Sequence, residues 1–494
     1  MKSNLWVAII LLPLFLSAQK EDYIWYFGRT GAGLDFNPMA GSTDCEPRLI
    51  TDTNTMSWEG AVSMCDKNTG RLLFYSDGIF LYNTEGNWMA GNSPAGLWNS
   101  NTQNVIIQQP GSDSIYYFIS PEPQAFCTIG NLLHHGLMYA IIDMSLDSGR
   151  GEIISRFNPL LDSGSCEKLT TVRNANGQDI WIVGHRYHNN SFFVFNVTGA
   201  GIDTIPAYYN VGPVIYTPQG GIAGINCFDA IGELKASTDG QKLAFTTFYN
   251  GISALFDFDN STGVISNPIQ LDLGWGGYGV SFSPDNSKLY IAGGDSSLIT
   301  TTGGGGRLYQ FDISSGDSAI INNSKTLIYQ SAAYSYGSLK LAPNGKIYGT
   351  LHSGNSAFGA PYLEVINYPD MAGLACGYLN NGFSLNGLWS SWGLNNSMEH
   401  YNHCMTDGIL QFSENNFELS ITPNPTTGPF EVSSNKKITG GLIFIYNLLG
   451  EQVYTTSLNN NRQIINCRLS AGIYFVRLIS ENGSAVQKLI VEEN

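Results

Sequence analysis

A short pattern recurs along most of the chain: an apolar run, a polar turn, and a second run that alternates. Its clearest copy is residues 283–291, where Pro284, Asp285 and Asn286 form the turn. Proline presets φ, and Asn, Asp or Gly tolerates the left-handed conformation that follows, so the turn is encoded locally. The alternating run behind it is typical of a strand. A strand-turn-strand unit repeated at several tens of residues predicts a repeat protein.

Six copies are recognisable, spaced by roughly 43 to 65 residues. They begin near residues 61, 104, 169, 234, 280 and 339. Each copy has the content of a four-stranded propeller blade, and residues 20–405 have room for seven blades of about 55 residues. We therefore predict an all-β fold with a seven-bladed β-propeller, closed by residues 23–27 and 385–395. A six-bladed ring with long insertions is the alternative.

Composition agrees with strands and turns. Charged residues make up 13% of the chain, while Gly (56), Tyr (26) and Phe (25) are plentiful. The formal net charge is -16, without a basic stretch. This balance argues against nucleic acid and anionic membrane surfaces as partners.

Residues 1–18 have the pattern of a secretory signal peptide, with Lys2, an apolar run and Leu16-Ser17-Ala18 before Gln19. Gln19 stands where a bacterial lipoprotein would have cysteine, so no lipid anchor is expected there. No later stretch is apolar enough to predict a transmembrane segment. The eight cysteines form no Cys-x-x-Cys pair, and their connectivity stays open.

The composition changes after residue 405. Residues 406–418 are a short polar linker, and residues 419–494 contain short alternating strands separated by turns such as Pro-Asn-Pro-Thr-Thr-Gly. We predict a small immunoglobulin-like β-sandwich for this C-terminal part.

The C-terminal part resembles the type A C-terminal sorting domain of bacterial type IX secretion. The elements that carry the resemblance are Pro423, Asn424, Pro425, Gly428, Tyr446, Asn447, Leu449, Gly450, Gly472, Tyr474 and Lys488. The resemblance implies export through an outer-membrane translocon to the cell surface or the extracellular space. It also implies a sorting protease as partner, with release or attachment to surface lipopolysaccharide.

The repeats themselves resemble the propeller-like repeats of exported bacterial surface proteins, a group that includes lactonase-like propellers. This second resemblance defines a fold and carries no chemistry.

Position gives the strongest argument for a site. Residues just before each innermost strand of a propeller surround one mouth of its channel. Here they are Glu59, Gln103, Glu167, Glu233, Tyr278, Tyr336 and Trp392. Carboxylates and aromatic rings in one concavity suit a sugar or a peptide. The alternative is that the aromatic rings only pack between blades, and Trp275 and Trp389 share this ambiguity.

Other clusters favour ordinary structural roles. His185 and His188, like His400 and His403, are spaced for loops, and no carboxylate completes a metal-ligand set. Asp257 and Asp259 begin like a calcium loop but lack its later ligands, so we expect them to cap a turn. The glycine-rich residues 28–33 lack the Gly-Lys-Ser/Thr ending of a phosphate loop, which leaves a bend. We therefore expect no metal and no cofactor.

From the sequence, the favoured function is binding or adhesion outside the cell, with a glycan or a peptide as ligand and without catalysis. Two alternatives stay open: a propeller hydrolase or lyase using Glu167, Glu233 or Glu59 as acid and base, and a structural surface component without a pocket.

Overall fold

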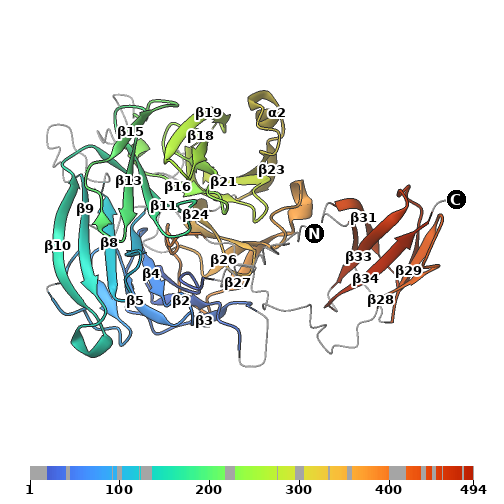
Figure 1. The fold of residues 1–494 in the computed structure, drawn as a ribbon, viewed down its shortest axis with the longest axis horizontal. Coiled ribbons are helices and arrows are strands. Elements are labelled where there is room, and N and C mark those ends of the chain that lie inside the picture. Colours follow the sequence, from blue (N-terminus) through green and yellow to red (C-terminus); the bar gives the residue numbers. More distant parts are fainter. Residues whose placement is uncertain are drawn as a thin grey trace, which may run out of the picture. The chain divides into compact units, whose positions relative to one another are not determined.

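The structure is a computed structural model, and it forms two compact units, Met1–Met405 and Thr406–Asn494 (Figure 1). It describes residues 19–39, 45–91, 93–96, 103–121, 123, 136–216, 228–274, 276–294, 305–331, 334–352, 359–399, 419–435, 441–447, 452–458, 460–480 and 483–492. The expected signal peptide (1–18) and linker (406–418) lie outside these residues, as do Trp275, His400, His403, Leu449 and Gly450.

In the first unit, the described residues form seven antiparallel sheets, each built from strands consecutive in the chain. The first three sheets are β1 (Ile24–Phe27), β2 (Ala32–Asp35) and β3 (Arg48–Ile50); β4 (Val62–Cys65), β5 (Leu72–Ser76) and β6 (Leu81–Asn83); and β7 (Val105–Gln108), β8 (Ile115–Pro121), β9 (Leu137–Asp143) and β10 (Glu152–Leu161).

The fourth and fifth sheets are β11 (Ser165–Arg173), β12 (Ile180–Arg186), β13 (Ser191–Thr198), β14 (Gly201–Ile202) and β15 (Ala207–Asn210); and β16 (Leu234–Ala236), β17 (Lys242–Phe245), β18 (Ile252–Asp259) and β19 (Val264–Asp272). The last two are β20 (Gly276–Phe282), β21 (Lys288–Gly294), β22 (Arg307–Asp312) and β23 (Thr326–Gln330); and β24 (Ser335–Leu341), β25 (Ile347–His352), β26 (Tyr362–Ile366) and β27 (Tyr378–Ser384). A short helix, α2 (Ser318–Asn323), precedes β23.

The predicted turns have the backbone conformation and the hydrogen bonds that their residues suggested. Residues 283–287 join β20 to β21, with Asn286 at a φ of 59° and Asp285 Oδ1 accepting a hydrogen bond of 2.9 Å from Ser287 N. Asp259 accepts from Ser261 N at 2.9 Å, as expected of a turn cap. The glycine-rich stretch is the expected bend between β1 and β2, with Gly28 and Gly31 at φ values of 73° and 79°.

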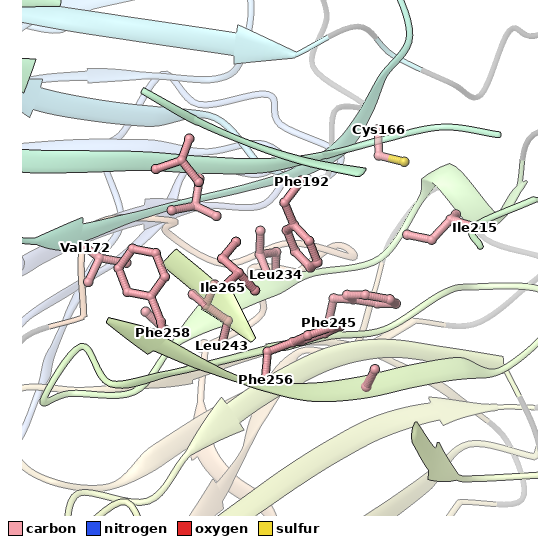
Figure 2. Close-up of a cluster of buried hydrophobic side chains, with 14 of the residues drawn as sticks. Cys166, Val172, Phe192, Ile215, Leu234, Leu243, Phe245, Phe256, Phe258 and Ile265 are labelled. Atoms are coloured by element: carbon pink, nitrogen blue, oxygen red, sulfur yellow. The ribbon is translucent and has the colours of Figure 1, made fainter. Parts of the chain in front are cut away.

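Apolar side chains fill the seams between successive sheets. Figure 2 shows the seam between the fourth and fifth sheets, where Phe192 of β13 faces Phe245 of β17 and Phe256 of β18. The Phe192 and Phe256 rings are 4.9 Å apart and meet edge to face, a favoured aromatic geometry. Similar clusters join the third sheet to the second and fourth, and the sixth to the fifth and seventh.

The ring closes where the last sheet meets the first. Trp25 of β1 lies edge to face with Tyr348 of β25, with their ring centroids 5.9 Å apart. From the first sheet to the seventh, the first strand of each sheet also lies against the first strand of the next. The first unit is therefore a β-propeller. Seven sheets favour the seven-bladed prediction over the six-bladed one, and the blade count itself stays a prediction.

The closure differs from the expectation in one respect. Residues 23–27 do supply β1, but residues 385–395 form no strand. The chain instead turns inward, and residues 390–399, here named the closing segment, hydrogen-bond to several sheets at the ring centre. Separate backbone hydrogen bonds, such as Trp392 N to Trp58 O and Asn396 N to Ala61 O, together with side-chain hydrogen bonds replace the strand ladder, which the sequence pattern could not indicate.

The second unit is a small all-β fold of two antiparallel sheets around one apolar core. Its sheets are β28 (Leu419–Thr422), β29 (Phe430–Ser434) and β32 (Arg462–Ile465), and β31 (Gln452–Leu458), β30 (Gly441–Tyr446), β33 (Gly472–Ser480) and β34 (Gly483–Val491). Asn424 bridges to the last strand, donating to Lys488 O at 2.6 Å and accepting from Ile490 N at 2.9 Å. Two of the predicted sorting residues, Asn424 and Lys488, are thus placed together.

Candidate ligand-binding site at the channel mouth

The closing segment occupies the centre of the propeller. Asn396 donates to Asn104 O and Leu169 O at 3.1 and 3.3 Å, and its Oδ1 accepts from Gln103 and Lys235 at 3.2 and 3.1 Å. Asn396 is 6% exposed. The chain therefore obstructs the channel with its own polar side chains.

Two buried ion pairs flank this centre. Lys340 Nζ lies 3.1 Å from Asp22 Oδ2, and Lys235 Nζ lies 3.0 Å from Glu399 Oε1. Burial raises the pKa of Asp22 and lowers the pKa of Lys340, because it penalises both charged forms. Burial opposes the charge of Lys235 too, but the neighbouring carboxylates of Glu399 and Glu233 outweigh it and raise the pKa of Lys235.

Three of the seven predicted mouth residues are brought together. Glu233 N donates to Tyr278 O at 3.1 Å, and the ring of Tyr278 lies 5.2 Å from the ring of Trp392. Glu233 is buried, and its carboxylate accepts from Val280 N at 3.0 Å and from the Ser338 hydroxyl. Burial raises the pKa of Glu233. This carboxylate joins three sheets of the ring.

The other four predicted residues have different surroundings. Gln103 is fully buried, and its Oε1 accepts from Leu169 N at 3.0 Å and Leu234 N at 2.7 Å, so it bridges two inner strands. Glu167 is also fully buried, within β11. Tyr336 lies within β24, and its hydroxyl contacts that of Tyr378 at 2.7 Å. Glu59 is partly exposed and lies beside the closing segment at Gly393.

The sequence placed Glu167, Tyr278 and Tyr336 before their strands, but the structure places them inside. The strands β11, β20 and β24 begin before these residues, and each strand has a register shift near its start. Such bulges re-aim side chains, and an alternating sequence pattern does not indicate them. A ligand-binding role for these residues stays a prediction.

Trp392 is the centre of an aromatic group drawn from three sheets. Its ring stacks on His352 at 4.4 Å and 20°, faces Tyr278 on the sixth sheet, and lies 5.7 Å from Phe248 at 81°. Thr350 fixes its backbone by donating to Trp392 O at 2.7 Å. We name Phe248, Tyr278, His352 and Trp392 the Trp392 cluster. Nothing near Phe248 or His352 in the sequence predicts a place in this cluster, because only the fold brings them to this tryptophan.

Two further tryptophans lie beside the Trp392 cluster. Trp392 N donates to Trp58 O at 3.0 Å, and the Arg29 guanidinium sits 3.9 Å from the Trp58 ring centroid. Trp389 is 37% exposed, and its backbone N–H donates to Thr30 Oγ1 at 2.7 Å. The mouth therefore carries aromatic surface that solvent can reach.

The described residues contain no group of three or more His, Cys, Asp or Glu side chains that could hold a metal ion. Within the same residues, no helix is long and apolar enough to cross a bilayer. Cys45 is disulfide-bonded, whereas Cys65, Cys166, Cys376 and Cys467 are free thiols.

The two units together define a class: a β-propeller followed by a small β-sandwich. Residues 420–492 match the family of secretion system C-terminal sorting domains. The C-terminal unit is thus a type IX sorting domain, and the protein interacts with the type IX secretion machinery and is exported to the cell surface or the extracellular space. The roles of its individual residues in sorting stay a prediction.

No curated protein matches the chain. Three solved structures illustrate its distant likenesses. The β-propeller domain of Cps50 (Swd1) from Myceliophteria thermophila is 12% identical, with 68% of this chain and 95% of that chain covered and a TM-score of 0.36. The periplasmic gluconolactonase PpgL of Pseudomonas aeruginosa is 11% identical, with 84% and 94% covered and a TM-score of 0.34.

The third is PorZ of Porphyromonas gingivalis, a surface component of the type IX secretion system. It is 12% identical, with 94% of this chain and 74% of that chain covered and a TM-score of 0.30. At these values the likenesses carry no argument about function.

Proposed function

We propose that this protein binds a glycan outside the cell, at the channel mouth around Trp392, without catalysis. The observation that supports the proposal is the convergence of aromatic rings from the fifth, sixth and seventh sheets on one tryptophan beside the partly exposed Trp389. Aromatic surface next to polar groups suits sugars, whose rings have apolar faces and hydroxyl edges.

The obstructed channel limits how a ligand binds. Asn396 and two buried ion pairs fill the ring centre, so the ligand docks on the mouth and does not pass through the propeller. The formal net charge of -16 disfavours polyanions. A neutral glycan fits both features best.

A structural surface component is the second candidate, and the same obstruction favours it. Hydrogen bonds and ion pairs of the chain itself stabilise the centre of the propeller. The propeller can therefore serve as a scaffold without a ligand. The hydrolase or lyase alternative has less support at Glu233, because this carboxylate is buried and accepts two hydrogen bonds inside the ring.

A glycan array probed with the secreted protein tests the proposal. We expect binding to at least one neutral polysaccharide, and about fivefold weaker binding for Trp389→Ala, since one aromatic contact is worth about 1 kcal/mol. Trp88→Ala is the matched control, because Trp88 is 62% exposed and stacks on Phe80 in the second sheet. If no glycan binds, the scaffold candidate stands instead.

A further inference from the structure

A cavity of about 300 Å³ lies at the end of the propeller opposite the channel mouth. It is bordered by the C-terminal halves of innermost strands, among them Met64 of β4, Gln108 of β7 and Arg173 of β11, and by Met398 of the closing segment. The turns that follow β7 and β11 border it too, so we name it the turn-face cavity. Because the closing segment fills the ring centre, this cavity is separate from the proposed glycan site.

Three charged side chains line the turn-face cavity: Glu21, Lys67 and Arg173. The Arg173 side chain is 29% exposed and also borders a neighbouring cavity of about 260 Å³, so a ligand can reach it. Two cations against one carboxylate give the wall a local excess of positive charge, although the formal net charge of the chain is -16. A concave wall of this charge favours an anionic ligand.

Glu21 neutralises Arg173 only in part. Glu21 Oε1 lies 3.8 Å from Arg173 Nη2, which is longer than a charged hydrogen bond, and the neutral amide oxygen of Gln19 contacts the same nitrogen. Burial raises the pKa of Glu21 and lowers the pKa of Arg173, because it penalises both charged forms. A guanidinium in this setting is stabilised by a carboxylate, which matches the planar array of its N–H donors.

Apolar side chains form much of the remaining wall. Met64, Ile106 and Ile180 border the cavity together with the half-buried Pro110 and Met398. Methionine is flexible and adapts to ligands of different shape. Apolar walls beside a cation suit a ligand with a hydrocarbon body and one charged end. A sugar lacks the charge, and a small hydrated anion gains nothing from these walls.

We propose that the turn-face cavity binds a carboxylate carried on an apolar chain, with Arg173 and Lys67 as its charged contacts. An aliphatic acid and the C-terminus of an apolar peptide both have this chemistry. Arg173 holds the carboxylate, Lys67 adds a second positive charge, and the negative charge of Glu21 opposes the ligand. The inference does not depend on the proposed glycan binding.

Calorimetric titration of the full chain with hexanoate and with N-acetyl-Leu-Leu, each beside its own amide, tests the ligand class. We expect at least one acid to bind about tenfold more tightly than its amide, since an ionised acceptor strengthens each hydrogen bond to a guanidinium. Binding of hexanoate indicates an aliphatic acid, and binding of N-acetyl-Leu-Leu indicates a peptide C-terminus. Equal binding of acid and amide, or no binding of either acid, overturns the inference and leaves the glycan proposal intact.

Charge substitutions test the residues. Arg173→Gln should weaken binding of the acid by about 10- to 100-fold. Arg150→Gln is the matched control, because Arg150 pairs with Asp147 at 2.8 Å and lines neither cavity. Glu21→Gln should tighten binding by about threefold or more, because it removes a nearby negative charge. Glu85→Gln makes the same change of charge at an exposed side chain outside the cavities and should leave affinity unchanged.

A gain of affinity separates recognition from a structural role, since a residue needed only for folding gives no gain when it is replaced. Arg173→Gln leaves Glu21 without its cation, so the double variant Glu21→Gln/Arg173→Gln provides a comparison without that unpaired charge. It should melt close to the wild type and bind the acid as weakly as Arg173→Gln. Wild-type affinity in the double variant, or no gain in Glu21→Gln, overturns the assignment of these residues.

Discussion

Lys340 Nζ lies 3.1 Å from Asp22 Oδ2, so the innermost strand of the last sheet is paired with the segment that enters the first. Both side chains are buried, at 0% and 6% exposed. Asp22 Oδ1 also accepts from Asn395 Nδ2 at 3.0 Å. One carboxylate therefore joins the start of the propeller, its last sheet and the closing segment.

Removing one partner of this pair should destabilise the propeller strongly. Lys340→Met leaves the Asp22 carboxylate buried without its cation, and we expect a loss of about 3–5 kcal/mol in the free energy of unfolding at pH 7. Urea unfolding of the full chain measures it. Lys242→Met is the control, because its pair with Asp257 is partly exposed and should be worth under about 1 kcal/mol. Equal losses in the two variants would contradict a structural role for the buried pair.

Asn396→Ala should also destabilise the ring, by about 2–4 kcal/mol, because it leaves several buried donors and acceptors unmet. The exposed Asn210 on β15 provides a control, and Asn210→Ala should change thermal stability little. Unaltered stability of Asn396→Ala would mean that the closing segment contributes little to closure.

His352 predicts a specific pH dependence of stability. Its pKa is about 4 when folded and 6.5 in the reference state, so the unfolded chain binds the extra proton between these values. The stabilisation is fully present above pH 6.5 and is lost as the pH falls toward 4, by about 3 kcal/mol. Unfolding of wild type and His352→Phe across this range should show the difference.

Asp285 should matter for stability and not for binding. It accepts from Ser283 Oγ at 2.7 Å and from Ser287 N at 2.9 Å within the turn between β20 and β21. Asp285→Ala should cost about 1–2 kcal/mol and leave glycan affinity unchanged. A loss of affinity without a loss of stability would place this turn in the site.

Deleting residues 419–494 should stop export. The sorting domain is the part of the chain that matches the secretion family, so the truncated protein should stay inside the cell while the full chain reaches the surface or the medium. Fractionation with antibody against the propeller distinguishes these outcomes. Normal secretion of the truncated protein would refute the role assigned to the tail.

The sequence predicted those features that depend on neighbours in the chain. The turn at Pro284, Asp285 and Asn286 and the bend at Gly28 and Gly31 follow from φ preferences that each residue carries with it. The position of Glu233 beside Tyr278 and Trp392 followed from blade geometry, although its side chain proved to be buried.

The remaining features depend on residues that meet only in the folded ring. His352 and Phe248 lie far from Trp392 in sequence, and nothing near either residue predicts the contact. The closing segment makes scattered backbone hydrogen bonds, and its side chains pair with distant ones such as Gln103 and Asp22, so it has no strand pattern. Long-range pairing of this kind leaves no periodicity to detect.

The closing segment should also limit the rate at which the propeller folds. Asn395 and Asp22 are 373 residues apart in sequence, yet they share a hydrogen bond at the ring centre. Contacts of such long sequence separation form slowly, because a large loop must close and lose chain entropy before any of these contacts can form. Since Lys235 pairs with Glu399 near the end of the first unit, the ring core is incomplete until nearly the whole propeller is available. We expect refolding to show a slow final phase, and of the substitutions named above Asn396→Ala should change the rate of this phase most. Ring closure is then the step that determines how long the chain remains incompletely folded.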